Sequence, residues 1–464
     1  MQSLSKSKTK QALTNSIKDG ATYSAMEGIT STYSTPFALA LGASNAEIGI
    51  LNSAPNLFIT LTQSFAGKYI EKRSKKEVCQ ALSLIQRFIW LIILLIPIIF
   101  LKESLWFFII LVTLSQVVLS FANTAWSSWI GNLVPEKIRG SYFGKRNTIQ
   151  AAFSFFTTLL AGWILGITKN LLGFSIIFSI AFIFGLISYF YLKKIPEAGY
   201  KKTENKNHDL NVLNFLKEFK KYSNFYPFTL HMSLLSFAVN IASPFFTVYM
   251  LSVMKVGYEW YGIVVASEIL TRILMLRYWG KLSDKFGDRT IMSLCNILIV
   301  FYPFLFLFVK IPFHLILISI FSGIAWSGFD LTSFNYLLDV TPPEKRPSYI
   351  ANYKVAVGTA LFLGPLIGGY LSQYLSSITL FWLNGLQFLF LLSFILRGIA
   401  TAYGLPRLKE VRVKKVLPVS DVFLKAFTVY PARGITHELV YVQNRFEYFE
   451  RDIIKKVRNL KKKF

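Results

Sequence analysis

Apolar runs of about twenty residues recur along almost the whole chain, and they constrain its fold more than any other feature. We count twelve such runs, each long enough to cross a bilayer as a helix. They cover residues 20–42, 48–67, 78–100, 105–131, 148–168, 171–192, 226–252, 259–280, 289–309, 313–338, 349–373 and 377–403. The sequence therefore predicts an all-α integral membrane protein with twelve transmembrane helices.

Basic residues gather in alternate connections between these runs. The net charge of +26 would suggest nucleic acid as the partner of a soluble protein. Here, however, Lys and Arg fill every second connection, and each intervening connection carries at most one lysine. Cytoplasmic loops of membrane proteins show this bias. We therefore expect a multi-pass protein of the plasma membrane with both termini cytoplasmic, lipid around it, and no nucleic-acid partner.

Polar stretches divide the chain into five parts. We expect a cytoplasmic N-terminal segment, a six-helix bundle, a cytoplasmic central loop, a second six-helix bundle and a cytoplasmic tail, at residues 1–19, 20–192, 193–225, 226–403 and 404–464. The central loop and the tail each contain an apolar stripe at helical spacing, which predicts amphipathic helices. For the tail helix, packing at the membrane surface and a coiled-coil contact both remain open.

The two halves of the chain share motifs in the same order. "GKYIEKRSKK" begins at Gly67 and "GKLSDKFGDR" at Gly280. A second pair is "PEKIRGSY" at Pro135 and "PEKRPSY" at Pro343, each a few residues after "AWS". Both halves start on the same side of the membrane, so this is a parallel duplication about an axis along the membrane normal.

These features resemble the major facilitator superfamily of secondary transporters, in an uncharacterised prokaryotic subgroup. The resemblance rests on twelve segments, a basic central loop and a G-x-x-x-D-[RK]-x-G-x-[RK] motif after the second and eighth segments. It implies two bundles that rock about a central site and a gating role for the motif. The residues of this motif are Gly280, Asp284, Lys285, Gly287 and Arg289 in the second half, and Gly67 and Glu71 in the first. Arg139 belongs to "PEKIRGSYFGKRN", which resembles a P-x-x-x-R-G motif that many members carry between the fourth and fifth segments.

The chemistry of the second motif agrees with a gate. Gly280 would let a neighbouring helix approach closely, and Gly287 can adopt a positive φ in a tight turn. Asp284 can meet the positive N-terminus of a neighbouring helix, and the resemblance implies that this is the helix expected at 349–373. A merely solvated basic turn explains the lysines, but it does not explain the glycine–acid–glycine spacing. The first motif is degenerate, because Glu71 stands where the pattern has Asp.

Charged residues inside the apolar runs are few, and burying a charge in lipid is costly. Glu268 and Arg272 are four residues apart, which suits an intramembrane ion pair. Asp330 has no basic residue within one helical turn, so we interpret it as a protonatable cavity group. Glu27 either faces the cavity or snorkels to the cytoplasm. The resemblance implies that segments 1, 4, 7 and 10 line the cavity, which adds Asn123, Trp126, Asn240 and Trp326.

The chain carries no nucleotide-binding loop, no metal-binding motif and no hydrolase elbow, so we expect neither an enzyme nor a cofactor or metal. The favoured function is a secondary transporter that moves a small molecule by alternating access, coupled to protons through Asp330 and Glu27. The alternatives are a membrane sensor or scaffold that signals through the tail, and a lipid-modifying enzyme. The cavity acids favour cationic or neutral amphipathic cargo. A monomer is the default oligomeric state.

The asymmetry between the two motifs yields a prediction. Asp284→Asn should slow transport more than Glu71→Gln, because the second motif keeps the acid and glycines that a gate needs. The initial rate of transport in proteoliposomes measures the difference. Equal rates for the two variants would show that the halves do not differ in this way.

Overall fold

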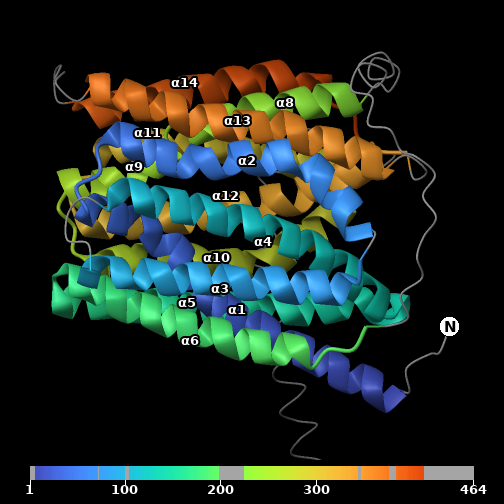
Figure 1. The fold of residues 1–464 in the computed structure, drawn as a ribbon. Coiled ribbons are helices and arrows are strands. Elements are labelled where there is room, and N and C mark those ends of the chain that lie inside the picture. Colours follow the sequence, from blue (N-terminus) through green and yellow to red (C-terminus); the bar gives the residue numbers. More distant parts are fainter. Residues whose placement is uncertain are drawn as a thin grey trace, which may run out of the picture.

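The computed structural model describes residues 6–71, 73–99, 104–197, 224–342, 346–375 and 383–411, and this part of the chain is all-helical (Figure 1). The amphipathic helices expected in the central loop and the tail lie outside the described residues. The first six helices are α1 (Lys6–Ala40), α2 (Asn45–Glu71), α3 (Lys75–Ile99), α4 (Leu105–Leu133), α5 (Arg139–Thr168) and α6 (Leu171–Lys193).

The second half repeats this series with one broken helix. The seventh predicted segment consists of α8 (Phe225–Asn240), α9 (Ser243–Val248) and the π-helical turn η2 (Tyr249–Val253). Pro244 at the start of α9 cannot donate a backbone hydrogen bond, which accounts for the break. The remaining helices are α10 (Tyr258–Phe286), α11 (Asp288–Leu305), η3 (Phe306–Phe308), α12 (Pro312–Asp339), α13 (Arg346–Leu375), α14 (Gly385–Gly404) and η4 (Leu405–Arg407).

Helix α1 begins well before the apolar run that predicted it. The expected boundary between residues 19 and 20 falls inside this helix, and Ala12, Ser16 and Asp19 are buried on it. Hydropathy missed these turns because they are polar. They are helical because they pack on other helices, and α1 contacts α2, α4, α5, α6 and α9.

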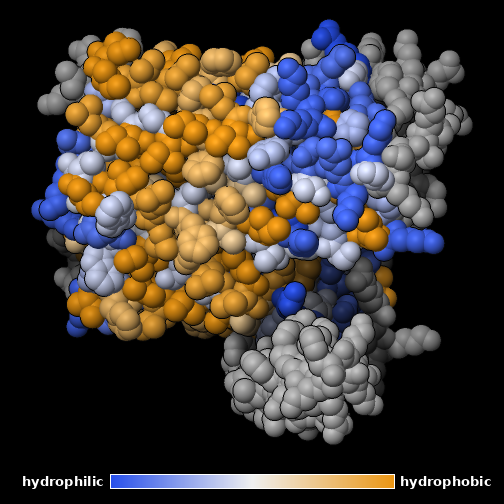
Figure 2. Space-filling model, turned by 90° about the horizontal axis from the view of Figure 1, so that it is seen from below, coloured by the Kyte–Doolittle hydropathy of each residue, from blue (hydrophilic) through white to orange (hydrophobic). Residues whose placement is uncertain are grey.

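An apolar belt surrounds the molecule between two polar ends (Figure 2). Within the described residues, nine helices are long and apolar enough to cross a membrane. Helices α1, α2 and α10 are not among them. A helix packed among other helices can carry polar residues without exposing them to lipid, as α1 does. The chain is a multi-pass membrane protein.

The helix contacts repeat between the two halves. In the first half α1 packs on α5 and α6, α3 packs on α4 and α6, and α2 packs on α4. In the second half α8 packs on α13 and α14, α11 packs on α12 and α14, and α10 packs on α12. Across the halves α2 packs along α13, as Figure 1 shows, and α5 packs along α10. Helix α10 is the equivalent of α2 in the second half, and α13 is the equivalent of α5. The α2–α13 and α5–α10 contacts are therefore equivalent to each other, as a duplicated chain requires.

The two ends of the bundle differ in charge. We call the end where α1 begins the basic end; it carries the connections α2–α3, α4–α5 and α10–α11 and lies on the right of Figure 1. The described connections at the opposite end contain the single lysines Lys169, Lys255 and Lys310.

Glycines bring the two halves together near the opposite end. A Cβ atom on Gly49 of α2 would lie 2.9 Å from the Cα of Gly369 on α13. A Cβ atom on Gly162 of α5 would lie 2.8 Å from the backbone carbonyl oxygen of Tyr258 on α10 and 3.1 Å from the Cα of Gly262. Both contacts are closer than a side chain allows, so the backbones meet there only because these residues are glycine.

The same substitution at two glycines should have opposite effects. Gly162→Ala should destabilise the protein by about 1–3 kcal/mol, because the new methyl group overlaps α10. A Cβ atom on Gly131 of α4 would have no atom within 4 Å, so Gly131→Ala should be neutral or stabilise by up to about 1 kcal/mol. Thermal unfolding in detergent compares them. A melting temperature that falls equally in both would contradict the close packing of α5 on α10.

Candidate functional site

Prolines inside the helices remove backbone donors, and side chains of other helices replace them. Pro36 of α1 has no N–H for the carbonyl of Thr32, and the Tyr261 hydroxyl of α10 donates to that carbonyl at 3.1 Å. Pro365 of α13 likewise frees a carbonyl, that of Leu361. The amide nitrogen of Asn56 on α2 lies 3.5 Å from it. Each of these bonds joins the first half of the chain to the second.

A cavity of about 320 Å³ lies between the halves beside these bonds. Helices α1, α2, α8, α9, α10 and α13 contribute to its wall. It is lined mainly by hydroxyl and amide side chains, and the full set is Ser31, Thr32, Thr35, Asn52, Asn56, Asn240, Ser243, Pro244, Thr247, Tyr261, Val265 and Pro365. Asn240 is the one residue of this set that the sequence had indicated. We call this space the interface cavity.

Acidic and basic side chains follow the interface cavity toward the basic end. On α10, Glu268 and Arg272 come one and two turns after Val265, and the predicted ion pair between them is present at 3.3 Å. The same guanidinium also contacts Asp330 of α12 at 3.3 Å. Sequence spacing could not reveal this second contact, because Arg272 approaches Asp330 from another helix. We call these three residues the charged triad.

The triad is accessible to solvent although Asp330 lies in α12, which is apolar enough to cross a membrane. The exposed fractions of the Glu268, Arg272 and Asp330 side chains are 30%, 39% and 54%. Asp330 also lies within electrostatic range of Cys295 on α11 and Tyr353 on α13, so protein surrounds it on several sides. The exposed part of the triad therefore lies among α10, α11, α12 and α13.

Glu27 and Trp326 differ in how far their side chains are exposed. The Glu27 side chain is exposed on α1, although five helices contact α1. The Ser31 hydroxyl, in the wall of the interface cavity, donates to the backbone carbonyl of Glu27 at 2.6 Å. Trp326 is half-buried one turn before Asp330 and packs edge-on against Phe329.

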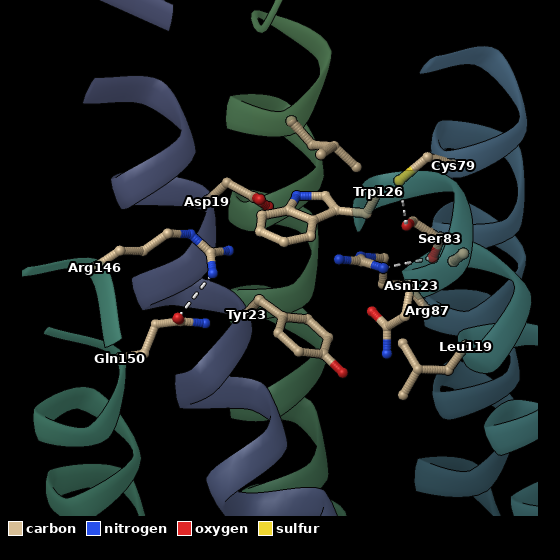
Figure 3. Close-up of a pocket in the computed structure, with 12 residues that line it drawn as sticks. Asp19, Tyr23, Cys79, Ser83, Arg87, Leu119, Asn123, Trp126, Arg146 and Gln150 are labelled. Carbon is tan, nitrogen blue, oxygen red and sulfur yellow. Dashed lines mark hydrogen bonds between the residues drawn. The ribbon is translucent and has the colours of Figure 1, made fainter. Parts of the chain in front are cut away.

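A second, smaller pocket of about 120 Å³ lies within the first half of the chain (Figure 3). Asn123 and Trp126 of α4 line it, as does Tyr23 of α1. In Figure 3, Trp126 and Tyr23 lie between the guanidinium groups of Arg146 and Arg87. The Arg146 guanidinium stacks on the Trp126 ring at 4.3 Å from its centroid, a cation–π contact.

Buried charges hold this pocket together. Arg87 of α3 is 2% exposed and donates to the Gly185 carbonyl at 2.9 Å, the Ser83 carbonyl at 2.7 Å and the Ser188 hydroxyl at 3.0 Å. Ser188 in turn donates to Asp19 of α1 at 2.7 Å. The network therefore joins α1, α3 and α6 through buried polar groups that bond to one another.

Sequence reasoning missed two charged residues that line this pocket, Asp19 and Arg146. Asp19 was expected in a polar segment outside the bundle, and Arg146 was expected in a basic connection. The feature that separates them from the prediction is helix length. Helix α5 begins at Arg139, nine residues before its apolar run, and this extension brings Arg146 inside the bundle. Arg397 of α14 was also missed; it is 1% exposed and donates to the Ile299 carbonyl, which Pro303 deprives of its helical donor, at 2.8 Å.

The glycines of the second motif behave differently from each other. Gly287 has a φ of +90° between α10 and α11, so the expected positive φ is confirmed. The closest atom to a Cβ on Gly280 would be a methyl carbon of Leu331 at 3.8 Å, so no helix approaches Gly280 closely in this conformation. The first motif lies in α2, where Gly67 and Glu71 belong to the last turns, and the side chain of Glu71 is outside the described residues.

The charged residues of the motifs have other surroundings than expected. Asp284 is exposed and pairs with no residue in the described part of the chain. Lys285 is exposed, with its ammonium 5.4 Å from the Phe286 ring centroid. Arg139 is exposed, and its guanidinium donates to the Gly131 carbonyl at 3.2 Å.

The buried acid of this loop is Asp288, not Asp284. Asp288 is 1% exposed and accepts hydrogen bonds from Ser283 and, at 3.2 Å, from Asn335. The backbone N–H of Arg289 donates to the Glu410 carboxylate at 3.0 Å, and the Arg289 guanidinium lies 3.4 Å from the Leu405 carbonyl. The segment after α14 therefore closes over the start of α11.

Comparisons with known proteins agree with this architecture. The sequence profile of the Major Facilitator Superfamily matches residues 20–276 and 260–435. An MFS-type transporter of Aspergillus terreus is 32% identical over 107 residues, which cover 23% of this chain and 19% of the relative. The multi-drug resistance efflux pump PmrA of Streptococcus pneumoniae is 25% identical over 162 residues, which cover 35% of this chain and 39% of the pump. The chain thus spans less than half the length of either relative.

Solved structures show the same fold at low sequence identity. The nucleoside transporter NupG, in a mutant form, has a TM-score of 0.67 at 15% identity and covers 86% of this chain and 100% of its own. A bacterial homologue of the iron transporter ferroportin has a TM-score of 0.64 in its inward-facing state, at 13% identity over 87% of this chain and 99% of its own. The outward-facing state of a bacterial ferroportin homologue reaches 0.58 at 14% identity, over 86% and 99%.

Two arginines should differ in their importance for stability. Arg87→Met should cost about 3 kcal/mol or more, because it removes buried hydrogen bonds and a positive charge near the buried Asp19. Arg272→Met should cost about 1 kcal/mol or less, because solvent already screens the triad. Thermal unfolding in detergent measures both. Equal losses of melting temperature would show that the Arg87 network is no more stabilising than the charged triad.

Proposed function

We propose that this chain, which belongs to the major facilitator superfamily, is a secondary transporter and not an enzyme. In this proposal it works by alternating access between two six-helix bundles, residues 20–192 and 226–403. The repeated helix contacts support this division, since they are equivalent under exchange of the halves. The interface cavity then lies between the bundles, where rocking of one against the other would expose it to each side in turn.

The observation that carries the proposal is a solvent-accessible, charged interior beneath a tightly closed end. Glycine contacts close the opposite end, and Glu27 and the charged triad remain accessible to water. Water must therefore enter from the basic end. The better agreement with an inward-facing than with an outward-facing ferroportin homologue is consistent with this state.

The positive-inside bias supports placing the basic end in the cytoplasm. In this orientation the termini, the central loop at residues 193–225 and the tail at 404–464 are cytoplasmic, and the described structure is open to the cytoplasm. The protein would then lie in the plasma membrane with lipid around its apolar belt. A single chain contains the complete cavity, in keeping with a monomer.

The second motif is proposed to close the cytoplasmic side in the other conformation. Asp284 is free to pair when the bundles rock, because it is exposed and has no described partner in this state. The positive φ of Gly287 turns the chain between α10 and α11. Lys285, Arg289, Arg139 and the first motif, with Gly67 and Glu71, would take part in the same closure at the basic end.

Asp330 and Glu27 are proposed as the groups that couple transport to protons. The Asp330 carboxylate is held by Arg272 at 3.3 Å. Protonation would cancel its charge and release Arg272 to Glu268 alone, which changes the charge facing the cavity. Asn123, Trp126, Asn240 and Trp326 would contact the cargo or the water that accompanies it. The relatives are named for different cargo, so none is carried over to this chain.

Transport driven by an imposed pH gradient in proteoliposomes tests this coupling. Uptake or release should follow the gradient in the wild-type protein, and Asp330→Asn and Glu27→Gln should each lose that dependence. Glu77→Gln, at an exposed position at the start of α3, is the matched control and should retain it. Transport that keeps its full pH dependence in Asp330→Asn would refute the coupling assignment.

Deletion of residues 410–464 separates a transporter from a sensor that signals through its tail. Transport by the shortened chain at the wild-type rate would make the tail accessory. A full-length chain that moves no solute, and that loses a bound protein partner on deletion, would favour the sensor.

A further inference from the structure

We infer that the interface cavity binds a small, uncharged molecule that carries several hydroxyl groups, such as a monosaccharide or a nucleoside. The inference rests on the proposed alternating-access function, since it names the class of cargo that the site between the bundles would take. Four properties of the cavity carry it: its hydrogen-bonding groups, its lack of charge, its size and its position.

Three asparagines present acceptors to the cavity. The side-chain nitrogens of Asn52, Asn56 and Asn240 each donate to the carbonyl four residues earlier on the same helix, at 2.9, 2.9 and 2.8 Å. These bonds identify the nitrogen of each amide and turn the other atom, Oδ1, away from the helix. No described residue donates to any of the three Oδ1 atoms. A ligand must therefore bring O–H or N–H donors to this wall.

The hydroxyl groups of the cavity are also partly committed. The Ser31 hydroxyl donates to the Glu27 carbonyl, and the Tyr261 hydroxyl donates to the Thr32 carbonyl. The Thr247 hydroxyl oxygen lies 3.4 Å from the Tyr261 hydroxyl oxygen, so these two hydroxyl groups are hydrogen-bonded to each other. The oxygens of these groups can still accept hydrogen bonds. Acceptors are therefore abundant on two sides of the cavity, which complements the many O–H donors of a polyol.

Charge separates this cavity from the space beside it. None of the twelve lining residues is ionisable at neutral pH, and nine carry a hydroxyl or an amide. Charged side chains begin toward the basic end, with Glu27 one turn from Ser31 and with the charged triad, where Arg272 neutralises one of the two acids. An anionic ligand in the cavity would lose water without gaining a counter-ion, and a cationic ligand would find its acids only beyond the cavity wall. An uncharged polar ligand exchanges its hydrogen bonds with water for bonds to the wall.

Size and position agree with such a ligand. A volume of about 320 Å³ corresponds to roughly ten water molecules at about 30 Å³ each, which is the scale of one sugar ring with its hydroxyls. The cavity lies at the closed end of the water-filled space and is walled by both halves. A ligand that bonds to both α2 and α13, or to both α1 and α10, bridges the two halves. Its hydrogen bonds would therefore change when the halves separate.

Binding to the purified full-length protein tests the assignment. The probes are neutral aldopentoses, aldohexoses and nucleosides, with D-glucosamine and D-gluconate as charged analogues of D-glucose and tetraphenylphosphonium as an apolar cation. At least one neutral probe should raise the melting temperature. Asn52→Leu and Asn56→Leu should each weaken its binding about ten-fold, since each removes an acceptor. Relative to that neutral probe, its charged analogues should lose affinity for the wild-type protein by at least the same factor.

A matched control separates the cavity from general effects of losing an asparagine. Asn352 of α13 makes the same bond to the carbonyl four residues earlier, at 3.0 Å, but does not line the cavity, so Asn352→Leu should bind like wild type. Thr35→Val keeps the shape of the side chain and removes only its hydroxyl. This variant should also weaken binding of the neutral probe. It therefore still tests the site if an asparagine variant fails to fold.

Several results would overturn the assignment. These are no binding by any neutral probe, equal binding by the charged analogues, or stabilisation by tetraphenylphosphonium that the asparagine variants leave intact. A neutral probe that binds but is not moved in proteoliposomes would support this site and count against alternating access. Transport of a charged solute, with no neutral probe bound, would support alternating access and count against this site.

Discussion

The hydrogen bonds of backbone carbonyls within the bundle are the constraint on which the rest of the structure depends. Lipid supplies no hydrogen-bond donors, so a carbonyl that a proline frees within the bundle is stabilised by a donor from another helix. Pro36, Pro303 and Pro365 each free one, and side chains of Tyr261, Arg397 and Asn56 approach them. Two of these three contacts cross between the halves. At Pro36 and Pro365, the freed carbonyls thus meet hydrogen-bond donors from the opposite half of the chain, beside the interface cavity.

The polar interior follows from the same constraint. Two sets of charged side chains lie within the helical bundle, and they differ in how far they are exposed to solvent. The Arg87–Ser188–Asp19 network is buried and joins three helices of one half, which suits a rigid body. The charged triad is a third to a half exposed and lies where α10 meets α12. Exposure allows the triad to exchange partners, so function belongs more naturally there than in the buried network.

Pattern and spacing predicted much of the candidate site but could not assemble it. The ion pair of Glu268 and Arg272 followed from spacing along one helix and is present. Its extension to Asp330 could not be predicted, because that contact joins residues far apart in the sequence. The interface cavity was missed almost entirely. Its serines, threonines and asparagines carry no charge and match no motif, so their common position becomes visible only when helices from both halves converge.

By itself the sequence determined that the chain is helical, crosses a membrane several times and contains a duplicated motif, because apolar length and repeated order are local properties. It also placed most helix ends within a few residues. Only the tertiary structure decided how far α1 and α5 extend, since their polar first turns are helical through packing that hydropathy does not measure. The tertiary structure also decided that Asp288 is the buried acid of the motif loop, because burial depends on Asn335 and on the segment after α14, which approach from elsewhere in the chain.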